Sequence, residues 1–351
     1  MGMDEGGIKM KVGINGFGRI GKAIFRNNLN KKYFNITEIN DINTDNENIA
    51  YQLKYDSIYG TLPNDIKIDK DILLVDEKRI KLHHEKEVHK VPWNVDVVID
   101  SSGDKTNVSN ARKIKNIKKY VVTHSFPKTS IDKEIVLGIN ESTITKNDKI
   151  ISSSICDTCA FAPVVNLLNK KYGIVYGVVT VLHPWLSYQN LLDGKPPFVR
   201  YPGYERGHYT LGRASTNSLI PKPTSCIIAT ERVLPWIKGK FTSLSFRVPT
   251  TTVSAADISV KLKKRELTKD KIQSLFREVE QKQSFNIFYN NYKPLISKDF
   301  EGMEYSVIID QNWTKLNNNN FLKILIWYDN EWGYSNLVVE LVKYIGGHSL
   351  E

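Results

Sequence analysis

The amino-acid sequence predicts an α/β fold with two domains. Its 351 residues exceed what one small core needs, and a hydrophobic content of 41% with a charged content of 25% is typical of a globular protein. Through the first half, apolar runs of strand length alternate with helical patterns, which is typical of a parallel sheet with crossover connections. We therefore expect an α/β first domain, followed by a second domain of the α+β class.

A glycine-rich turn lies between a predicted strand at residues 9–15 and a helical pattern. It reads Gly16-Phe17-Gly18-Arg19-Ile20-Gly21. In such a turn the first glycine permits the tight bend, the second lets the backbone approach a pyrophosphate, and the third lets the helix pack closely on the strand. The pattern predicts a Rossmann dinucleotide site made of Asn15, Gly16, Phe17, Gly18, Arg19, Ile20 and Gly21.

An acidic residue after the second predicted strand, residues 34–39, indicates which dinucleotide binds. Asp41 lies 20 positions after Gly21, where a carboxylate can accept hydrogen bonds from ribose hydroxyls. This placement favours NAD over NADP. The same residue can also serve as a turn or helix-cap residue, and the sequence leaves that alternative open.

Three further strands are expected in the first half, at residues 72–75, 95–100 and 119–123. The strand at 95–100 delivers a polar loop to the carboxyl edge of the sheet, where ligands of such sheets bind. We therefore predict that Ser102 and Gly103 contact the cofactor.

The second half contains a cysteine in the position of a nucleophile. A predicted strand at residues 149–153 is followed by Cys156 and an apolar-faced helix that runs to Tyr172. A helix N-terminus favours a thiolate, so we expect a lowered pKa for Cys156 and amide donors for an oxyanion. A single cysteine also packs readily in a core, and Cys159 can either pack or form a reversible disulfide with Cys156.

A β-rich run at residues 173–182 ends in His183, where a histidine can face a cleft. These segments resemble the glyceraldehyde-3-phosphate dehydrogenase family, whose nucleophilic cysteine and catalytic histidine are separated by 27 positions, as Cys156 and His183 are. The resemblance covers nearly the whole chain. It rests on these runs: Ile14-Asn15-Gly16-Phe17-Gly18-Arg19-Ile20-Gly21, Asn40-Asp41, Tyr55-Asp56-Ser57, Ala162-Pro163, Phe246-Arg247-Val248-Pro249-Thr250 and Trp327-Tyr328-Asp329-Asn330-Glu331-Trp332-Gly333-Tyr334-Ser335-Asn336.

The resemblance implies an NAD-dependent aldehyde dehydrogenase that works through an acyl-enzyme. Cys156 would attack the aldehyde to give a thiohemiacetal, and His183 would take the hydroxyl proton as hydride leaves for NAD, so that a thioester remains. Asn330 would hydrogen-bond the nicotinamide amide, and Tyr334 would lie beside the nicotinamide. In the family, inorganic phosphate then releases the acyl group.

Around both catalytic positions this sequence departs from the family. The family's Ser and Thr beside the nucleophile, which help to hold the attacking phosphate, are Ile155 and Asp157 here. An aliphatic group donates no hydrogen bond, and a carboxylate repels a phosphate dianion at contact distance. The family's Thr and Asp after the histidine are Leu186 and Tyr188 here. These changes predict an altered substrate or acyl acceptor.

Four residues make up the predicted substrate site: Arg213, Lys222, Thr224 and Arg247. By resemblance, the two arginines occupy family positions that bind anions, and Thr224 is retained. Lys222 either replaces lost phosphate donors or pairs with Asp157, and the sequence does not decide between these outcomes. We expect a small aldehyde substrate, and an anionic one.

The composition and the resemblance also predict which partners the protein has and in which compartment it works. The net charge of +11 is spread along the chain, so we expect no dedicated nucleic-acid site. We expect no membrane span, no metal and, with three cysteines, a cytoplasmic protein without a disulfide framework. The resemblance implies a homotetramer. The loop at residues 194–211 is longer than the family's corresponding loop, in keeping with a different substrate or a subunit contact.

We assign residues 10–154 to an NAD-binding Rossmann domain, on which a C-terminal helix at 335–345 packs back, and residues 155–325 to the catalytic domain. The alternative to an active enzyme is a catalytically impaired NAD-binding paralogue with a regulatory or interaction role. The retained Cys156 and His183 argue against that alternative, and the reactivity of the thiol distinguishes the two.

Overall fold

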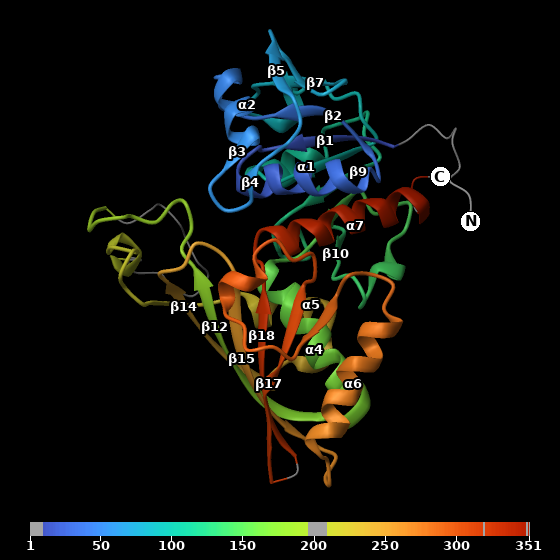
Figure 1. Ribbon diagram of the computed structural model, residues 1–351. Coiled ribbons are helices and arrows are strands. Elements are labelled where there is room, and N and C mark those ends of the chain that lie inside the picture. Colours follow the sequence, from blue (N-terminus) through green and yellow to red (C-terminus); the bar gives the residue numbers. More distant parts are fainter. Residues whose placement is uncertain (1–9, 196–208, 319, 349, 351) are drawn as a thin grey trace. The chain divides into compact units, whose positions relative to one another are not determined.

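The computed structural model describes residues 10–195, 209–318, 320–348 and 350 (Figure 1). By their internal contacts these residues form two compact units. The first unit contains the described residues up to Ile135, residues 140–154, and those from Ser335 onward. The second contains residues 136–139 and the described part of 155–334. Most of the loop at 194–211, namely residues 196–208, lies outside the described part of the chain.

The first unit is built on a sheet whose described strands run in the order β10-β11-β9-β8-β1-β2-β7-β6-β5. From β10 to β7 all neighbours are parallel. Read from β7 to β11, the order is the 3-2-1-4-5-6 arrangement of a Rossmann sheet. The strands are β1 (Lys11–Asn15), β2 (Asn35–Asn40), β5 (Ile66–Asp69), β6 (Ile72–Val75), β7 (Lys78–His83), β8 (Val97–Asp100), β9 (Lys119–Val122), β10 (Lys133–Glu134) and β11 (Ile150–Ser152).

The expectation of a parallel sheet is wrong for one of the predicted strands. The strand predicted at residues 72–75, β6, pairs antiparallel with both β5 and β7. Only two residues separate β5 from β6 and β6 from β7, and a connection this short can join only antiparallel strands. Lys70 and Asp76, one in each turn, have positive φ angles of 55° and 52°.

Helices and a small hairpin complete the first unit. The hairpin joins β3 (Tyr55–Asp56) to β4 (Gly60–Thr61), and the helices are α1 (Arg19–Lys31), α2 (Asn46–Lys54), α3 (Thr106–Ala111) and, from Ser335 onward, α7 (Trp332–His348). All four residues of β8 are buried, as expected for a central strand with both faces covered. The C-terminal helix contributes to this unit through contacts such as that of Lys343, whose ammonium lies 4.0 Å from the centre of the Tyr33 ring.

The second unit contains a mixed sheet with the described order β13-β14-β12-β15-β18-β17-β16. Its strands are β12 (Ile174–Pro184), β13 (Ile220–Lys222), β14 (Phe241–Val248), β15 (Ser254–Leu262), β16 (Phe288–Asn291), β17 (Val307–Asn317) and β18 (Phe321–Tyr328). Its helices are α4 (Cys156–Tyr172), α5 (Cys226–Val233) and α6 (Lys269–Lys282). In Figure 1, α4 lies against this sheet, where it contacts β12, β15, β17 and β18. The predicted fold class, a Rossmann domain with an α+β second domain, is confirmed.

The glycine-rich turn has the backbone that its pattern predicts. Gly16 has a φ of +85°, and a Cβ there would lie 2.4 Å from Cα of Ser102. At Gly21 a Cβ would lie 2.2 Å from the carbonyl oxygen of Gly16. At Gly18, by contrast, a Cβ would meet no atom within 4 Å. Two of the glycines are therefore required by the fold itself, and Gly18 leaves an open approach to the backbone.

No helix in the described part of the chain is long and apolar enough to cross a membrane.

The two glycines predict different effects of one added methyl group. Gly21→Ala forces the turn or α1 to shift, so we expect it to lower the free energy of unfolding by about 1–3 kcal/mol. Gly18→Ala is the matched control and should change this free energy by less than about 1 kcal/mol. Urea unfolding followed by circular dichroism measures both, and equal losses in the two variants would contradict this account of the turn.

Candidate active site

The predicted nucleophile and base lie side by side in the second unit. Cys156 is the first residue of α4, and His183 is the penultimate residue of β12. Because α4 packs on the sheet that contains β12, Sγ of Cys156 comes to 3.8 Å from Nε2 of His183. Catalytic pairs are often this loosely spaced before substrate binds.

The imidazole of His183 is held in one tautomer. Its Nδ1 lies 2.8 Å from the carbonyl oxygen of Pro184, which can only accept, so Nδ1 carries the proton and Nε2 presents a lone pair to the thiol. Burial and the charge of Arg247 lower the pKa of His183 to about 3. The ring is therefore neutral and available to accept a proton.

Asp157, the second residue of α4, is the centre of a polar network beside this pair. Its Oδ1 accepts a hydrogen bond from Tyr328 at 2.9 Å and lies 3.5 Å from Sγ of Cys156. Its Oδ2 accepts a hydrogen bond from Thr224 at 3.0 Å. Three segments far apart in the sequence, the start of α4, the end of β18 and the residues before α5, meet at this carboxylate.

The carboxylate of Asp157 is charged although it is buried. Burial acts to raise its pKa, but the neighbouring His183 and Lys222 and the hydrogen bonds from Tyr328 and Thr224 outweigh that effect, and the pKa of Asp157 is lowered. Each of these hydrogen bonds stabilises the ionised form. At neutral pH a fixed negative charge therefore lies against the thiol.

This charge reverses the expected effect of the helix N-terminus on Cys156. Burial, and then the charge and hydrogen bond of Asp157, raise the pKa of the Cys156 thiol well above its ordinary value. The expectation of a lowered pKa was wrong, because burial of the thiol and then the adjacent carboxylate outweigh the effect of the helix dipole. The thiol must therefore lose its proton to an acceptor such as Nε2 of His183 as it attacks.

Three of the four residues predicted to bind substrate lie around this network: Lys222, Thr224 and Arg247. Burial, and then the charge of Arg247, lower the pKa of Lys222 to about 8, while Asp157 acts in the opposite direction. Lys222 is 7% exposed and donates to the carbonyl oxygen of Pro223 at 3.0 Å. Lys222 acts to lower the pKa of Asp157 and Asp157 acts to raise that of Lys222, and both roles that the sequence left open for Lys222 stay predictions.

Arg247 is adjacent to His183 in the β12–β14 pairing. Its guanidinium donates to the carbonyl oxygen of Pro184 at 3.3 Å and to the hydroxyl of Tyr188 at 3.1 Å. Arg213, the fourth predicted residue, is placed differently. It forms an ion pair of 2.8 Å with Asp193 on the surface, where its side chain is 70% exposed.

The predicted cofactor residues of the first unit lie where β1, β2 and β8 end together. Asn15 ends β1, the glycine turn follows it, Asp41 follows β2, and Ser102 and Gly103 follow β8, while Arg19, Ile20 and Gly21 open α1. The backbone N–H of Phe17 donates to Oδ2 of Asp41 at 2.5 Å. Asp41 thus fixes the glycine turn, and its second oxygen binds the N–H of Asn43.

The two cofactor residues predicted in the second unit, Asn330 and Tyr334, are 6% and 5% exposed. Oδ1 of Asn330 is buried and has no hydrogen-bond partner among the described residues. A buried polar atom without a partner is rare in a folded protein and calls for a ligand or water. The side chain therefore fits the expected contact with the nicotinamide amide.

Sequence reasoning missed two residues that organise these sites. Tyr328 belongs to a run that resembles the family, and its hydroxyl donates a hydrogen bond to Asp157. Asp100 at the end of β8 accepts hydrogen bonds from Asn15 and Ser102 through Oδ1 and from Tyr120 through Oδ2. In both cases the signal was a polar group at the end of a buried strand.

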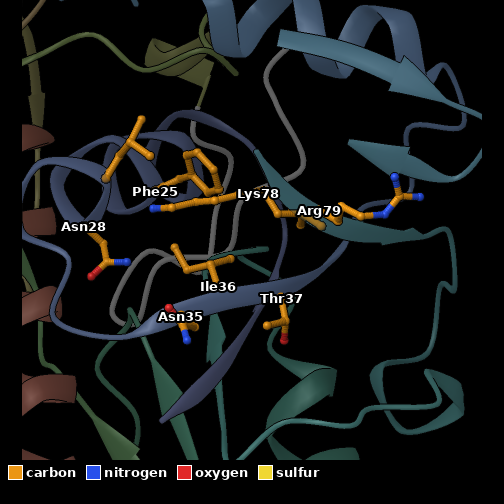
Figure 2. Close-up of a pocket in the computed structure, with 9 residues that line it drawn as sticks. Phe25, Asn28, Asn35, Ile36, Thr37, Lys78 and Arg79 are labelled. Atoms are coloured by element: carbon orange, nitrogen blue, oxygen red, sulfur yellow. The ribbon is translucent and has the colours of Figure 1, made fainter. Parts of the chain in front are cut away.

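A pocket of about 180 Å³ lies elsewhere in the first unit, between α1 and the starts of β2 and β7. Figure 2 shows residues that line this pocket, among them Phe25, Ile36 and Lys78. Dinucleotides bind at the carboxyl ends of the strands in such sheets, and this pocket is at the amino ends. It is therefore separate from the cofactor residues.

Cys156, Asp157 and His183 also resemble a metal site, since their ligand atoms lie within 4.8 Å of one another. Thiolate, imidazole and carboxylate are all ligands of zinc. Two of these side chains, Cys156 and His183, are also the nucleophile and the base that covalent chemistry on an aldehyde requires.

Comparisons with known proteins agree with this geometry. Residues 10–108 match the family model for the glyceraldehyde 3-phosphate dehydrogenase NAD binding domain, and residues 155–330 match the model for the C-terminal domain of that enzyme. Glyceraldehyde-3-phosphate dehydrogenase 1 of Bacillus cereus is 35% identical to this chain over 97% of it and 99% of the relative.

Further relatives come from distant organisms. Glyceraldehyde-3-phosphate dehydrogenase B of Aspergillus oryzae is 35% identical over 95% of this chain and 98% of the relative. Glyceraldehyde-3-phosphate dehydrogenase 2 of Streptomyces avermitilis is 36% identical over 97% of this chain and 99% of the relative. With both family models matched in order and full-length relatives above 30% identity, the chain belongs to the glyceraldehyde-3-phosphate dehydrogenase family of NAD-dependent oxidoreductases.

Proposed function

We propose that this protein oxidises a small aldehyde through a covalent intermediate on Cys156, with a substrate or acyl acceptor that differs from the family's. The observation that carries the proposal is the 3.8 Å approach of Sγ of Cys156 to the unprotonated Nε2 of His183. A nucleophile and a neutral base in contact are the minimum that thiol addition to an aldehyde requires.

In the first step the sulfur attacks the aldehyde carbon and the thiol proton passes to Nε2 of His183, which returns it to the new oxygen to give a thiohemiacetal. His183, neutral again, then removes this hydroxyl proton, and a thioester on Cys156 results. NAD, when bound, accepts the hydride released in this step. Asp157 stabilises the imidazolium formed in each transfer, since its charge acts to raise the pKa of His183.

We assign cofactor binding to residues 10–154 with the C-terminal helix, and catalysis to residues 155–325. The glycine turn would hold the pyrophosphate, Asp41 the ribose hydroxyls, and Ser102 with Gly103 the neighbouring part of the cofactor. The open approach at Gly18 and the unpartnered Oδ1 of Asn330 support this assignment. Tyr334 would lie beside the nicotinamide.

The buried cations Lys222 and Arg247 support a small anionic aldehyde as the substrate. The side chains around them differ from those of the family, which supports a substrate other than the family's. Lys222, Thr224 and Arg247 lie around the nucleophile, but Arg247 donates to the hydroxyl of Tyr188 and Thr224 donates to Asp157. Donors engaged in this way bind a phosphate group less readily. Arg213 would join the substrate site only by leaving Asp193.

One observation favours the alternative of a catalytically impaired, NAD-binding paralogue. The raised pKa of Cys156 leaves little thiolate at neutral pH, whereas catalytic cysteines usually have lowered pKa values. We favour the active enzyme, because His183 can take the proton during attack and so removes the need for a preformed thiolate.

We further propose a cytoplasmic homotetramer. The three cysteines are free thiols, as in a reducing compartment. An apolar patch on the sheet of the second unit supports self-association. It comprises Val175, Tyr176, Val178 and Leu182 of β12 and Leu244 of β14, all exposed. Contiguous apolar patches of this kind mark protein interfaces.

Catalysis predicts Cys156-dependent formation of NADH. We expect turnover with a small aldehyde other than glyceraldehyde 3-phosphate, no activity in Cys156→Ala, and a loss of about 10²- to 10⁴-fold in His183→Asn, which cannot accept the proton. Absorbance of NADH measures the rate with glyceraldehyde 3-phosphate and unphosphorylated aldehydes, each with and without phosphate. Efficient, phosphate-dependent turnover of glyceraldehyde 3-phosphate would refute the changed substrate and acceptor.

The pKa of Cys156 predicts how its alkylation by iodoacetamide depends on pH. Since burial and Asp157 disfavour the thiolate, the rate should still be rising above about pH 8.5, the ordinary thiol pKa. Removing the charge in Asp157→Asn should shift the profile to lower pH. Cys156→Ala gives the background from the buried Cys159 and Cys226. A wild-type profile that levels off below about pH 8.5 would contradict the role given to Asp157.

The apolar patch predicts the assembly. Light scattering after size exclusion should give the mass of four chains for the wild type and a smaller species for Leu182→Glu with Leu244→Glu, because the two charges would be buried in the interface. Ile296→Glu is the matched control, since Ile296 is 66% exposed and lies outside the patch. A monomeric wild type, or equal effects of both changes, would refute the assignment.

A further inference from the structure

A buried carboxylate lies where the acyl group must be released. In the proposed reaction the thioester carbon is bonded to Sγ of Cys156, and the acyl acceptor must reach that carbon. Oδ1 of Asp157 is 3.5 Å from this sulfur. Any acceptor that approaches from this side of the thiol therefore enters next to a negative charge.

The hydroxyl groups beside the thiol donate their hydrogen bonds to Asp157, so they do not donate to an incoming anion. Thr224 donates to Oδ2 at 3.0 Å and Tyr328 donates to Oδ1 at 2.9 Å. Each hydroxyl has a single proton, so a phosphate oxygen at the same place would meet acceptors instead of donors. Ile155, which precedes the nucleophile, has no side-chain donor.

The nearby cations do not restore an anion site. Asp157 offsets the charge of Lys222, whose ammonium also donates to the carbonyl oxygen of Pro223. Arg247 donates to Pro184 and to Tyr188. A phosphate dianion would bring two negative charges next to the charge of Asp157. A neutral acyl acceptor meets no such repulsion, and it can donate a hydrogen bond to the carboxylate of Asp157.

We propose that Asp157 makes water the acyl acceptor, so that the thioester on Cys156 is hydrolysed to a free carboxylate; this rests on the proposed function. One hydrogen of the attacking water is bound by Asp157, and Nε2 of His183 removes the other as the oxygen bonds to the thioester carbon. The carbon–sulfur bond then breaks, the sulfur leaves as a thiolate, and His183 returns the proton to it. The carboxylic acid product releases its own proton to solvent.

His183, and not Asp157, is placed to remove the proton. Both oxygens of Asp157 already accept hydrogen bonds, from Tyr328 and Thr224, so this carboxylate serves as a fixed acceptor. Nε2 of His183 is unprotonated and 3.8 Å from the sulfur that carries the acyl group. The charge of Asp157 also stabilises the imidazolium that forms.

The acceptor can be tested without knowing the natural aldehyde. p-Nitrophenyl acetate acylates a thiol whose proton a neighbouring base can accept, and release of p-nitrophenolate reports acylation while acetate or acetyl phosphate reports the acceptor. For the full-length wild type we expect a Cys156-dependent burst, acetate that carries ¹⁸O from labelled water, and a deacylation rate that changes less than about twofold with added inorganic phosphate. Phosphorus NMR should show no acetyl phosphate.

Variants separate the role of Asp157 from a structural one. Asp157→Asn should slow hydrolysis by about tenfold or more, the effect typical of losing a fixed polar group at a reacting centre. Asp157→Thr, which also supplies a hydroxyl donor, should make deacylation phosphate-dependent and yield acetyl phosphate. Asp310→Asn is the matched control: Asp310 is a buried carboxylate of the same unit that binds Trp327, and its loss should leave the acceptor unchanged.

The outcomes distinguish this inference from the proposed function. If wild type shows no Cys156-dependent burst with the ester and no NADH formation, the nucleophile is wrong and both proposals fail. If the burst occurs but wild type forms acetyl phosphate faster than acetate, only the choice of water is overturned. The choice of water is also overturned if Asp157→Thr folds and shows the burst, but its deacylation rate is as independent of added phosphate as that of the wild type.

Discussion

The arrangement around the nucleophile depends on the buried carboxylate of Asp157, which contacts the thiol of Cys156 and accepts hydrogen bonds from Thr224 and Tyr328. This carboxylate keeps the sulfur protonated, which leaves His183 to accept a proton only during attack. It draws the hydroxyls of Thr224 and Tyr328 toward itself and lowers the net positive charge around Lys222. In our proposal, the first turn of α4 therefore determines both how the thiol reacts and which acyl acceptors can reach it.

The two halves of the proposed reaction are conserved in the structure to different degrees. The parts to which we assign hydride transfer resemble the family closely: the glycine turn, Asp41, Asn330 and the Cys156–His183 pair. The parts that serve phosphate in the family carry two aliphatic side chains, a carboxylate and a tyrosine in the places of three hydroxyls and an acid. The two sets of residues can differ in this way, because the oxidation step depends on the cofactor and on Cys156 with its base. Acyl release depends instead on the side chains around the thioester, such as Ile155 and Asp157.

Local patterns predicted most of the fold, and the family resemblance implied the pairing of Cys156 with His183. β1, α1, β2, β8 and β9 follow from apolar periodicity and glycine placement, and the expected strand and helix ends were within a few residues. The antiparallel direction of β6 was missed, because it follows from turn length and not from apolar content. The anchoring of Asp157 by Tyr328 was also missed, since 171 positions separate them and only tertiary packing joins them. For the same reason the sign of the pKa shift at Cys156 was wrong: the helix start is local, but burial is not.

The placement of Asp157 also bears on the direction of metabolism. A phosphate acceptor preserves the free energy of a thioester in an acyl phosphate, and the reaction can then run either way. Transfer to water dissipates that free energy as heat, so the aldehyde could not be regenerated from the carboxylate by this protein. One side chain in the first turn of a helix would thus convert a reversible, energy-conserving step into a committed one, suited to removing an aldehyde or to closing a biosynthetic branch.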